Sequence, residues 1–92
     1  MSAEPTDSRR RKLIFRADHR GFKEMDLFMG EFARTHVPAM NEAQLAEFEA
    51  ILNMEDQEVY SWITGQETPS DAARSGTLDL VLSFRYSGAD NI

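Results

Sequence analysis

The stretch FKEMDLFMGEFARTH, residues 22–36, carries the clearest periodic signal in the chain. Its apolar residues recur at intervals of three and four, which is the spacing of one face of an α-helix. A stripe of methionine and phenylalanine is more typical of a buried helix face than of a cofactor site, so we expect it to form the core. His36 is expected as a helix-terminal residue rather than a ligand, and Pro38 as the stop. The stripe consists of Phe22, Met25, Phe28, Met29, Phe32 and Ala33.

Helices are also predicted on either side of this one. An amphipathic helix is expected from Ser8 to near His19, and Gly21 is free to take the left-handed conformation that closes helices. Downstream, Asn41 and Gln44 have the spacing of a capping box, which indicates the start of a third helix.

The last third of the chain predicts two more helices, the second of them ambiguous. One should run from about Asp56 to a C-cap at Gly65, with Trp62 as an anchor in the core. TPSD at 68–71 then has proline and an acid where helix starts favour them, whereas TLDLVLSFRY at 77–86 alternates as a strand does. We interpret this last element as a helix, because no other strand pattern is present for a strand to pair with.

These elements predict an all-α fold, a compact five-helix bundle in a single domain. A chain of 92 residues has room for one domain of this kind. We expect a disordered N-terminal segment over 1–8, a helical bundle over 9–86 and a flexible C-terminal tail over 87–92.

The composition argues against a metal site and against catalysis. The chain has no cysteine and two histidines, His19 and His36, which are too few for a zinc site without carboxylates. Acid–base catalysis needs carboxylates that converge in a dry pocket, whereas Glu24 and Asp26 point roughly 200° apart on a helix. Neither a nucleophile-elbow pattern nor a phosphate-binding glycine pattern occurs. We expect no metal, no catalytic residue and no enzyme.

Charge is distributed unevenly along the chain. The net charge is -6, yet RRRK at 9–12 together with Arg16 and Arg20 holds six of the ten Lys and Arg residues. A basic arm can bind nucleic acid, but the RRRK run contains no aromatic residue and the acidic remainder repels phosphates. We therefore expect no nucleic-acid binding and interpret the arm as a solvated helix start or as a docking surface for an acidic protein.

The chain also lacks membrane signals. No apolar run approaches the roughly 18 residues that cross a bilayer, and no secretory signal is found near the N-terminus. We expect no membrane contact and a cytoplasmic protein, or one of the mitochondrial matrix if a transit peptide has already been removed.

The charges of HRGFKEMD, residues 19–26, surround one glycine. This segment is at least a turn between two helices, and it can also be a binding surface. Leu27 should project away from the apolar stripe, in line with Glu24 and Glu31, and so be exposed beside these acids.

A family resemblance supports the second interpretation. The stretch RKLIFRADHRGFKEMDLFMGEFA at 11–33, followed by EDQEVYSWITG at 55–65 and by TPSD, closely resembles the small succinate dehydrogenase assembly factors that promote covalent attachment of FAD to the flavoprotein subunit. Their signature, RGxxE, is met by Arg20, Gly21 and Glu24, and the similarity covers roughly residues 9–85. The resemblance implies a five-helix fold, in agreement with the periodicity.

The resemblance also implies a partner. Members of this family bind the flavoprotein subunit of succinate dehydrogenase before it joins the rest of the enzyme, with the RGxxE region at the contact. The FAD and the histidine that becomes bonded to it belong to that partner, so we expect no cofactor of the chain's own. Arg20 would supply a bidentate contact and Glu24 a partner for a cation. The residues expected to bind the partner are His19, Arg20, Gly21, Glu24 and Asp26.

Two questions stay open in the sequence. Fumarate reductase could be a second partner, and the same surface could instead serve a general interaction module or an antitoxin-like adaptor with another partner. We expect the protein itself to be a monomer.

Overall fold

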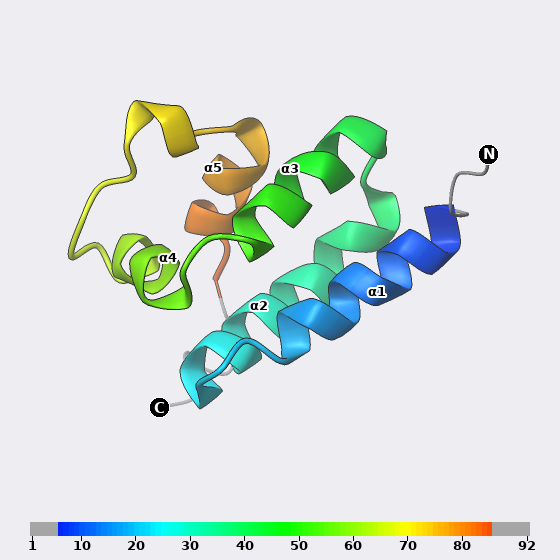
Figure 1. The fold of residues 1–92 in the computed structure, drawn as a ribbon, viewed down its shortest axis with the longest axis horizontal. Helices are drawn as coiled ribbons and strands as arrows, with labels where there is room; N and C mark the ends of the chain where they lie inside the picture. The colour runs from blue at the N-terminus through cyan, green and yellow to red at the C-terminus, as the bar shows by residue number, and fades with distance from the viewer. Residues whose placement is uncertain (1–5, 86–92) are drawn as a thin grey trace.

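The computed structural model describes residues 6–85, and every regular element in that range is helical (Figure 1). The predicted all-α, five-helix, single-domain fold is confirmed. The parts of the predicted terminal segments that fall in 1–5 and 86–92 lie outside the described residues. The elements are α1 (Thr6–Asp18), α2 (Lys23–His36), α3 (Glu42–Leu52), α4 (Asp56–Ile63) and α5 (Gly76–Ser83), with 3-10 turns η1 (Val37–Ala39) and η2 (Asp71–Ala73).

Helices α1 and α2 form a hairpin on which the other helices are assembled. Figure 1 shows α2 returning alongside α1 after a short turn, with α3 next to them and α4 and α5 beyond α3. Helix α3 contacts both α1 and α5, and α5 also contacts α4. The α1–α2 turn and the junction of α3 with α4 therefore come to the same end of the molecule.

Helix α1 starts earlier than predicted because its first turn is tied to α3. It begins at Thr6, two residues before Ser8 and inside the segment expected to be disordered. The Thr6 hydroxyl donates to Glu42 at 2.8 Å. Polar contacts of this kind are not visible in a helix-periodicity pattern, which explains the displaced boundary.

Part of the basic arm has an intramolecular role. Arg9 donates to Glu42 at 3.0 Å and to Glu49 at 3.2 Å, both on α3. Arg10 donates to the Met40 carbonyl at 2.6 Å, at the entrance to α3. The interpretation of the whole arm as a solvated helix start is therefore wrong for these two arginines, whereas Arg11 is exposed.

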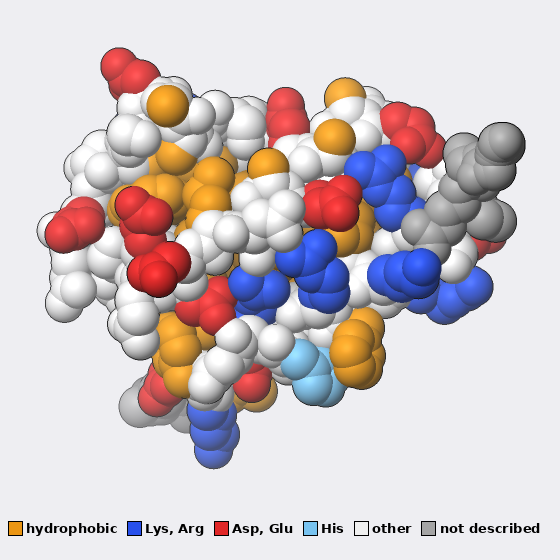
Figure 2. Space-filling model, viewed as in Figure 1, with side chains coloured by type: hydrophobic (Ala, Val, Ile, Leu, Met, Phe, Trp, Pro, Cys, Tyr) orange, Lys and Arg blue, Asp and Glu red, His pale blue; other side chains and the backbone are white. Residues whose placement is uncertain are grey.

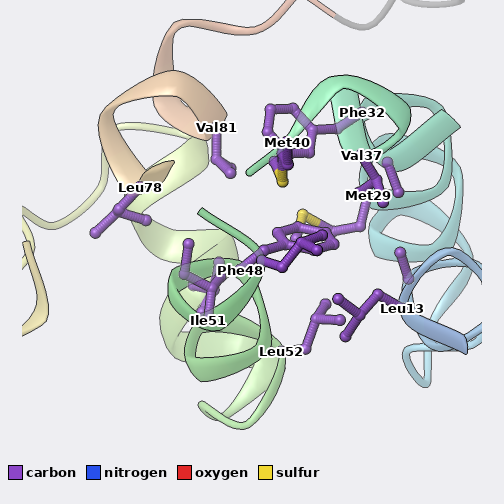
Figure 3. Close-up of a cluster of buried hydrophobic side chains, with 14 of the residues drawn as sticks. Leu13, Met29, Phe32, Val37, Met40, Phe48, Ile51, Leu52, Leu78 and Val81 are labelled. Carbon is purple, nitrogen blue, oxygen red and sulfur yellow. The ribbon is translucent and has the colours of Figure 1, made fainter. Parts of the chain in front are cut away.

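The predicted apolar stripe of α2 lies in the core. Met25, Met29, Phe32 and Ala33 are buried, and Figure 3 shows Met29 and Phe32 among side chains from α1, α3 and α5. Phe22 and Phe28 of the stripe pack against this core while staying partly exposed. The other buried members of the cluster are Leu13, Ala17, Val37, Met40, Leu45, Phe48, Ile51, Leu52, Val59, Trp62, Leu78 and Val81.

The predicted caps of α3 and α4 are confirmed. Asn41 accepts from the Gln44 amide at 2.9 Å, and Gln44 accepts from the Asn41 amide at 2.9 Å, which completes a capping box. Gly65 has a φ of +82°, and its amide donates to the Trp62 carbonyl at 3.2 Å, as in a glycine-closed helix end. Trp62 is also a core residue, as expected.

The helical interpretation of the last element is confirmed, but its predicted start is wrong. Residues 68–71 lead into η2 rather than into an α-helix, and α5 begins only at Gly76. The hydroxyl of Ser75 accepts from a backbone amide in the first turn of α5 at 3.0 Å, so this serine is the N-cap. The proline and acid at 68–71 thus start only the short 3-10 turn η2, because Arg74 is extended and ends it.

One buried polar contact fixes α5 against α3. Thr77 is 2% exposed, and both its amide and its hydroxyl donate to Oε1 of Glu47, at 3.1 and 2.7 Å. The carboxylate therefore satisfies two donors that have lost their contact with water.

We predict that Glu47→Ala lowers the free energy of unfolding by about 1–3 kcal/mol, because it leaves buried donors of Thr77 without an acceptor. Urea unfolding followed by circular dichroism would measure this loss. Glu47→Gln keeps an oxygen acceptor and should retain most of the stability. Equal losses in the two variants would contradict this account of the contact.

Candidate partner-binding site at the α1–α2 turn

Arg20, the first residue of the RGxxE signature, holds together three parts of the chain. Its Nε and Nη2 lie 3.0 and 2.8 Å from Oδ1 of Asp56, the first residue of α4. Nη2 also donates to the Leu52 carbonyl at the end of α3, at 2.6 Å, and Nη1 to the Arg16 carbonyl of α1, at 3.4 Å. The side chain is 11% exposed. Arg20 therefore has an intramolecular role, and the predicted bidentate contact with a partner stays a prediction.

Asp26 holds the backbone of the same turn. Its Oδ1 accepts hydrogen bonds from the amides of Arg20 and Gly21, the second at 3.2 Å. Asp26 lies in the first turn of α2, where a negative charge is favoured by the helix dipole. This carboxylate thus fixes the course of the chain between α1 and α2.

Gly21 is required by the geometry of the turn. Its φ is +140°, a value that side-chain-bearing residues rarely adopt. A Cβ at this position would lie 3.3 Å from Oδ2 of Asp56, the carboxylate that binds Arg20. The predicted left-handed glycine is confirmed, and its second function is to leave room for the ion pair.

Glu24 differs from Arg20 and Asp26 because its charge is not used within the described chain. It is exposed in the first turn of α2, and no hydrogen bond or ion pair of its carboxylate is found among residues 6–85. Leu27, one helical turn further on, is 41% exposed, which confirms the predicted outward direction. Glu24 is thus the residue of the signature whose charged group is available to another molecule.

His19 lies on the α1 side of the turn and pairs with a residue that the sequence reasoning missed. Its Nδ1–H donates to the Phe15 carbonyl at 2.7 Å, and the two rings stack with centroids 4.1 Å apart. Phe15 is 63% exposed. The signal was present in the sequence, because Phe15 lies about 200° around the helix from Leu13 and from Ala17 and so cannot share their buried face.

The turn borders an open depression. Its volume is 450 Å³, and its walls are the turn residues 20–22 and the α3–α4 junction, residues 53–57. Figure 2 shows Lys and Arg side chains along α1 on this face and Asp and Glu side chains gathered toward α4. The second residue that sequence reasoning missed is Asp56, which it treated only as a helix start.

Neither a metal site nor a membrane span is found in the described part of the chain. Residues 6–85 contain no group of three or more His, Asp or Glu side chains placed to hold a metal ion. None of the helices in this range combines the length and the apolar character that crossing a bilayer requires.

Residues 11–85, which include the whole turn, match the family described as flavinator of succinate dehydrogenase, Sdh5. The chain belongs to the Sdh5 family. This match agrees with the resemblance expected from the RGxxE signature and from the five-helix pattern.

Individual Sdh5 relatives come from fungi, plants and bacteria. Succinate dehydrogenase assembly factor 2, mitochondrial, of Saccharomyces cerevisiae is 39% identical over 61 residues, which are 66% of this chain and 38% of the relative. Its Arabidopsis thaliana namesake is 34% identical over 64 residues, 70% of this chain and 34% of the relative. FAD assembly factor SdhE of Acetobacter pasteurianus is 41% identical over 59 residues, 64% of this chain and 54% of the relative. The matched region thus spans between about a third and about half of these relatives' own lengths.

We predict that Gly21→Ala is destabilising by about 1–3 kcal/mol, because the substitution forces a side chain into a conformation reserved for glycine. Thermal or urea unfolding would measure the loss. Gly76→Ala is the matched control, since a Cβ there meets no atom within 4 Å, and it should be neutral or stabilising by up to about 1 kcal/mol. A fully stable Gly21→Ala protein would contradict the assigned role.

A double-mutant cycle tests the Arg20–Asp56 pair. We expect Arg20→Ala and Asp56→Ala to be non-additive, with a coupling energy of about 1–3 kcal/mol, because either single change leaves a largely buried charge without its partner. The control cycle uses Arg74 and Asp79, whose side chains are 49% and 66% exposed at 3.7 Å and whose coupling should fall near about 0–1 kcal/mol. Equal coupling energies in both cycles would show that the Arg20–Asp56 pair contributes no more than an exposed ion pair.

Proposed function

We propose that this protein is an assembly factor that binds the flavoprotein subunit of succinate dehydrogenase and promotes the covalent attachment of FAD to it. The observation that carries the proposal is the RGxxE turn of an Sdh5 family member. Arg20 and Asp26 hold this turn rigid, while the Glu24 carboxylate is exposed and has no partner among residues 6–85. A fixed turn whose signature carboxylate has no partner in this described range is suited to recognition.

Binding fits this surface better than catalysis does. The carboxylates nearest the turn are engaged with backbone amides and with Arg20, so they are not free to move protons. Glu24 is exposed to water, whereas a catalytic acid or base is usually held in a dry pocket. The function we propose is therefore non-enzymatic.

In this proposal the chain acts through orientation. The exposed backbone at Gly21 and the charge of Glu24 contact a segment of the flavoprotein. The Arg20–Asp56 pair keeps the turn, and with it this contact, in one geometry. The factor would hold the partner's own histidine close to its bound flavin. Such positioning of two reacting groups can lower the activation free energy by several kcal/mol.

FAD remains the partner's cofactor in this proposal. The described residues contain no glycine-rich phosphate loop of the kind that binds dinucleotides. Titration of the isolated protein with FAD should accordingly leave the flavin fluorescence unchanged. A cytoplasmic location, the monomeric state and a role toward fumarate reductase stay predictions.

A general interaction module or an antitoxin-like adaptor is the alternative that uses the same surface. Capture of binding partners with the purified protein separates the two proposals. Only the assembly-factor proposal expects enrichment of a flavoprotein subunit of succinate dehydrogenase or fumarate reductase, followed by gain of covalent flavin fluorescence in that subunit.

We predict that Glu24→Ala stays folded but fails to support flavinylation at low concentration. Removing a helix-start charge costs about 0.3–1 kcal/mol of stability, whereas truncating one partner of an interfacial charge pair costs about 2–5 kcal/mol of binding. The second value corresponds to about thirtyfold or more in affinity. Covalent flavin fluorescence of the partner in a gel, over a concentration series of the factor, measures the effect.

Asp79→Ala is the matched control for this experiment. Asp79 is also an exposed carboxylate in the first turn of a helix, but it lies on α5, away from the α1–α2 turn (Figure 1). We expect wild-type flavinylation from this variant and partial recovery of Glu24→Ala when the factor is in excess. Wild-type activity of folded Glu24→Ala at every concentration would refute the role of Glu24.

A further inference from the structure

The outer face of α1 carries an exposed aromatic side chain at the edge of an open groove. Phe15 is 63% exposed, although Leu13 and Ala17 on the opposite face of the same helix are fully buried. The groove has a volume of 360 Å³. The residues that line the groove are Ser8, Arg11, Lys12, Phe15 and Arg16. Together with His19, which stacks on Phe15, they form the outer surface of α1, which we call the α1 ridge.

Phe15 is held in place rather than free to rotate into solvent. His19 stacks on it with an interplanar angle of 26°, and the same histidine is fixed by the hydrogen bond from its Nδ1–H to the Phe15 carbonyl. An aromatic side chain that is already ordered loses little conformational entropy when a partner covers it. Such residues are over-represented among the anchors of protein interfaces.

The charge of the α1 ridge is opposite to that of the chain as a whole. Arg11 is exposed and has no ion pair or hydrogen bond to any residue in 6–85. Arg16 donates to Asn53 at 2.7 Å, and its nearest carboxylate, that of Glu49, is 3.8 Å away. The chain as a whole carries a net charge of -6 and so repels an acidic segment. The cationic α1 ridge, in contrast, attracts one.

Nucleic acid fits the same face less well. Arg9 and Arg10, which would extend a phosphate-binding row, are bound to Glu42, Glu49 and the Met40 carbonyl. Few cations are then left to face a phosphate backbone. Affinity for nucleic acid depends on how many phosphates the protein neutralises, so we expect it to be low here.

The α1 ridge is continuous with the RGxxE turn. His19, its last member, directly precedes Arg20, and the Arg20 guanidinium also binds the Arg16 carbonyl. Arg16 also donates to Asn53, which lines the depression beside Gly21. A partner segment that contacts Gly21 can therefore continue along α1.

We propose that the α1 ridge is a second docking contact for the partner that binds the RGxxE turn, and that it takes an acidic segment of that partner with an apolar side chain packed on Phe15. This proposal rests on the proposed function, because it assigns the occupant to the same flavoprotein subunit. Arg11 steers the encounter, and Phe15 slows dissociation.

Two variants of the full chain test the ridge by binding kinetics with the purified flavoprotein subunit. Arg11→Glu should lower the association rate about tenfold at low salt, with the difference shrinking as salt is raised. Phe15→Ala should weaken affinity about tenfold to thirtyfold, mainly through faster dissociation. Arg74→Glu, a charge reversal of equal size between η2 and α5, should bind as the wild type does.

The outcomes separate this proposal from the proposed function. If wild-type protein binds the flavoprotein and Glu24→Ala weakens that binding, while both ridge variants bind normally, the ridge is overturned and the function survives. Absence of wild-type binding overturns both. A wild-type dimer in sedimentation that Phe15→Ala dissociates would assign the ridge to self-association and overturn the proposal. Circular dichroism of each variant confirms that the helices are intact.

Discussion

The contact between Arg20 and Asp56 ties three helices together around the α1–α2 turn. One guanidinium binds a carboxylate at the start of α4, a carbonyl at the end of α3 and a carbonyl of α1. Because a charge that is largely removed from water must be paired, these segments cannot move apart without a large cost. Glycine suits position 21 for two reasons: its φ is +140°, and a Cβ there would lie in tight contact, 3.3 Å, with Oδ2 of the same carboxylate.

This constraint divides the RGxxE signature into two kinds of residue. Arg20 and Gly21 build the turn, with Asp26 holding its amides, whereas Glu24 points its charge to solvent. A binding surface with such support pays little ordering entropy on association, which favours affinity from a small contact area. Substitutions in the first group would act on binding through the fold, and substitutions of Glu24 would act on it directly.

The basic residues of α1 also divide into those that stabilise the fold and those that face solvent. Arg9 and Arg10 reach carboxylates and a carbonyl on the α3 side, so their charge stabilises the packing of α1 on α3. Arg11 lies on the outer face with Phe15. The excess of positive charge at the N-terminal end of the sequence is therefore smaller on the surface than the sequence suggests, and it is gathered beside one exposed aromatic ring.

Periodicity, capping and a short signature are local properties of the chain. They were enough to predict the all-α class, the buried stripe of α2, the caps at Asn41 and Gly65 and the family. They also located the turn around Gly21. The sequence also holds the start of the last helix, since the Leu78 amide bonds to the Ser75 hydroxyl three residues away, although the start signals at 68–71 pointed elsewhere. Packing of the helices was needed to bring Arg20 to Asp56, which lies 36 residues further along the chain. Such pairings depend on which side chains the packed helices bring within hydrogen-bonding distance, and no local pattern encodes that distance.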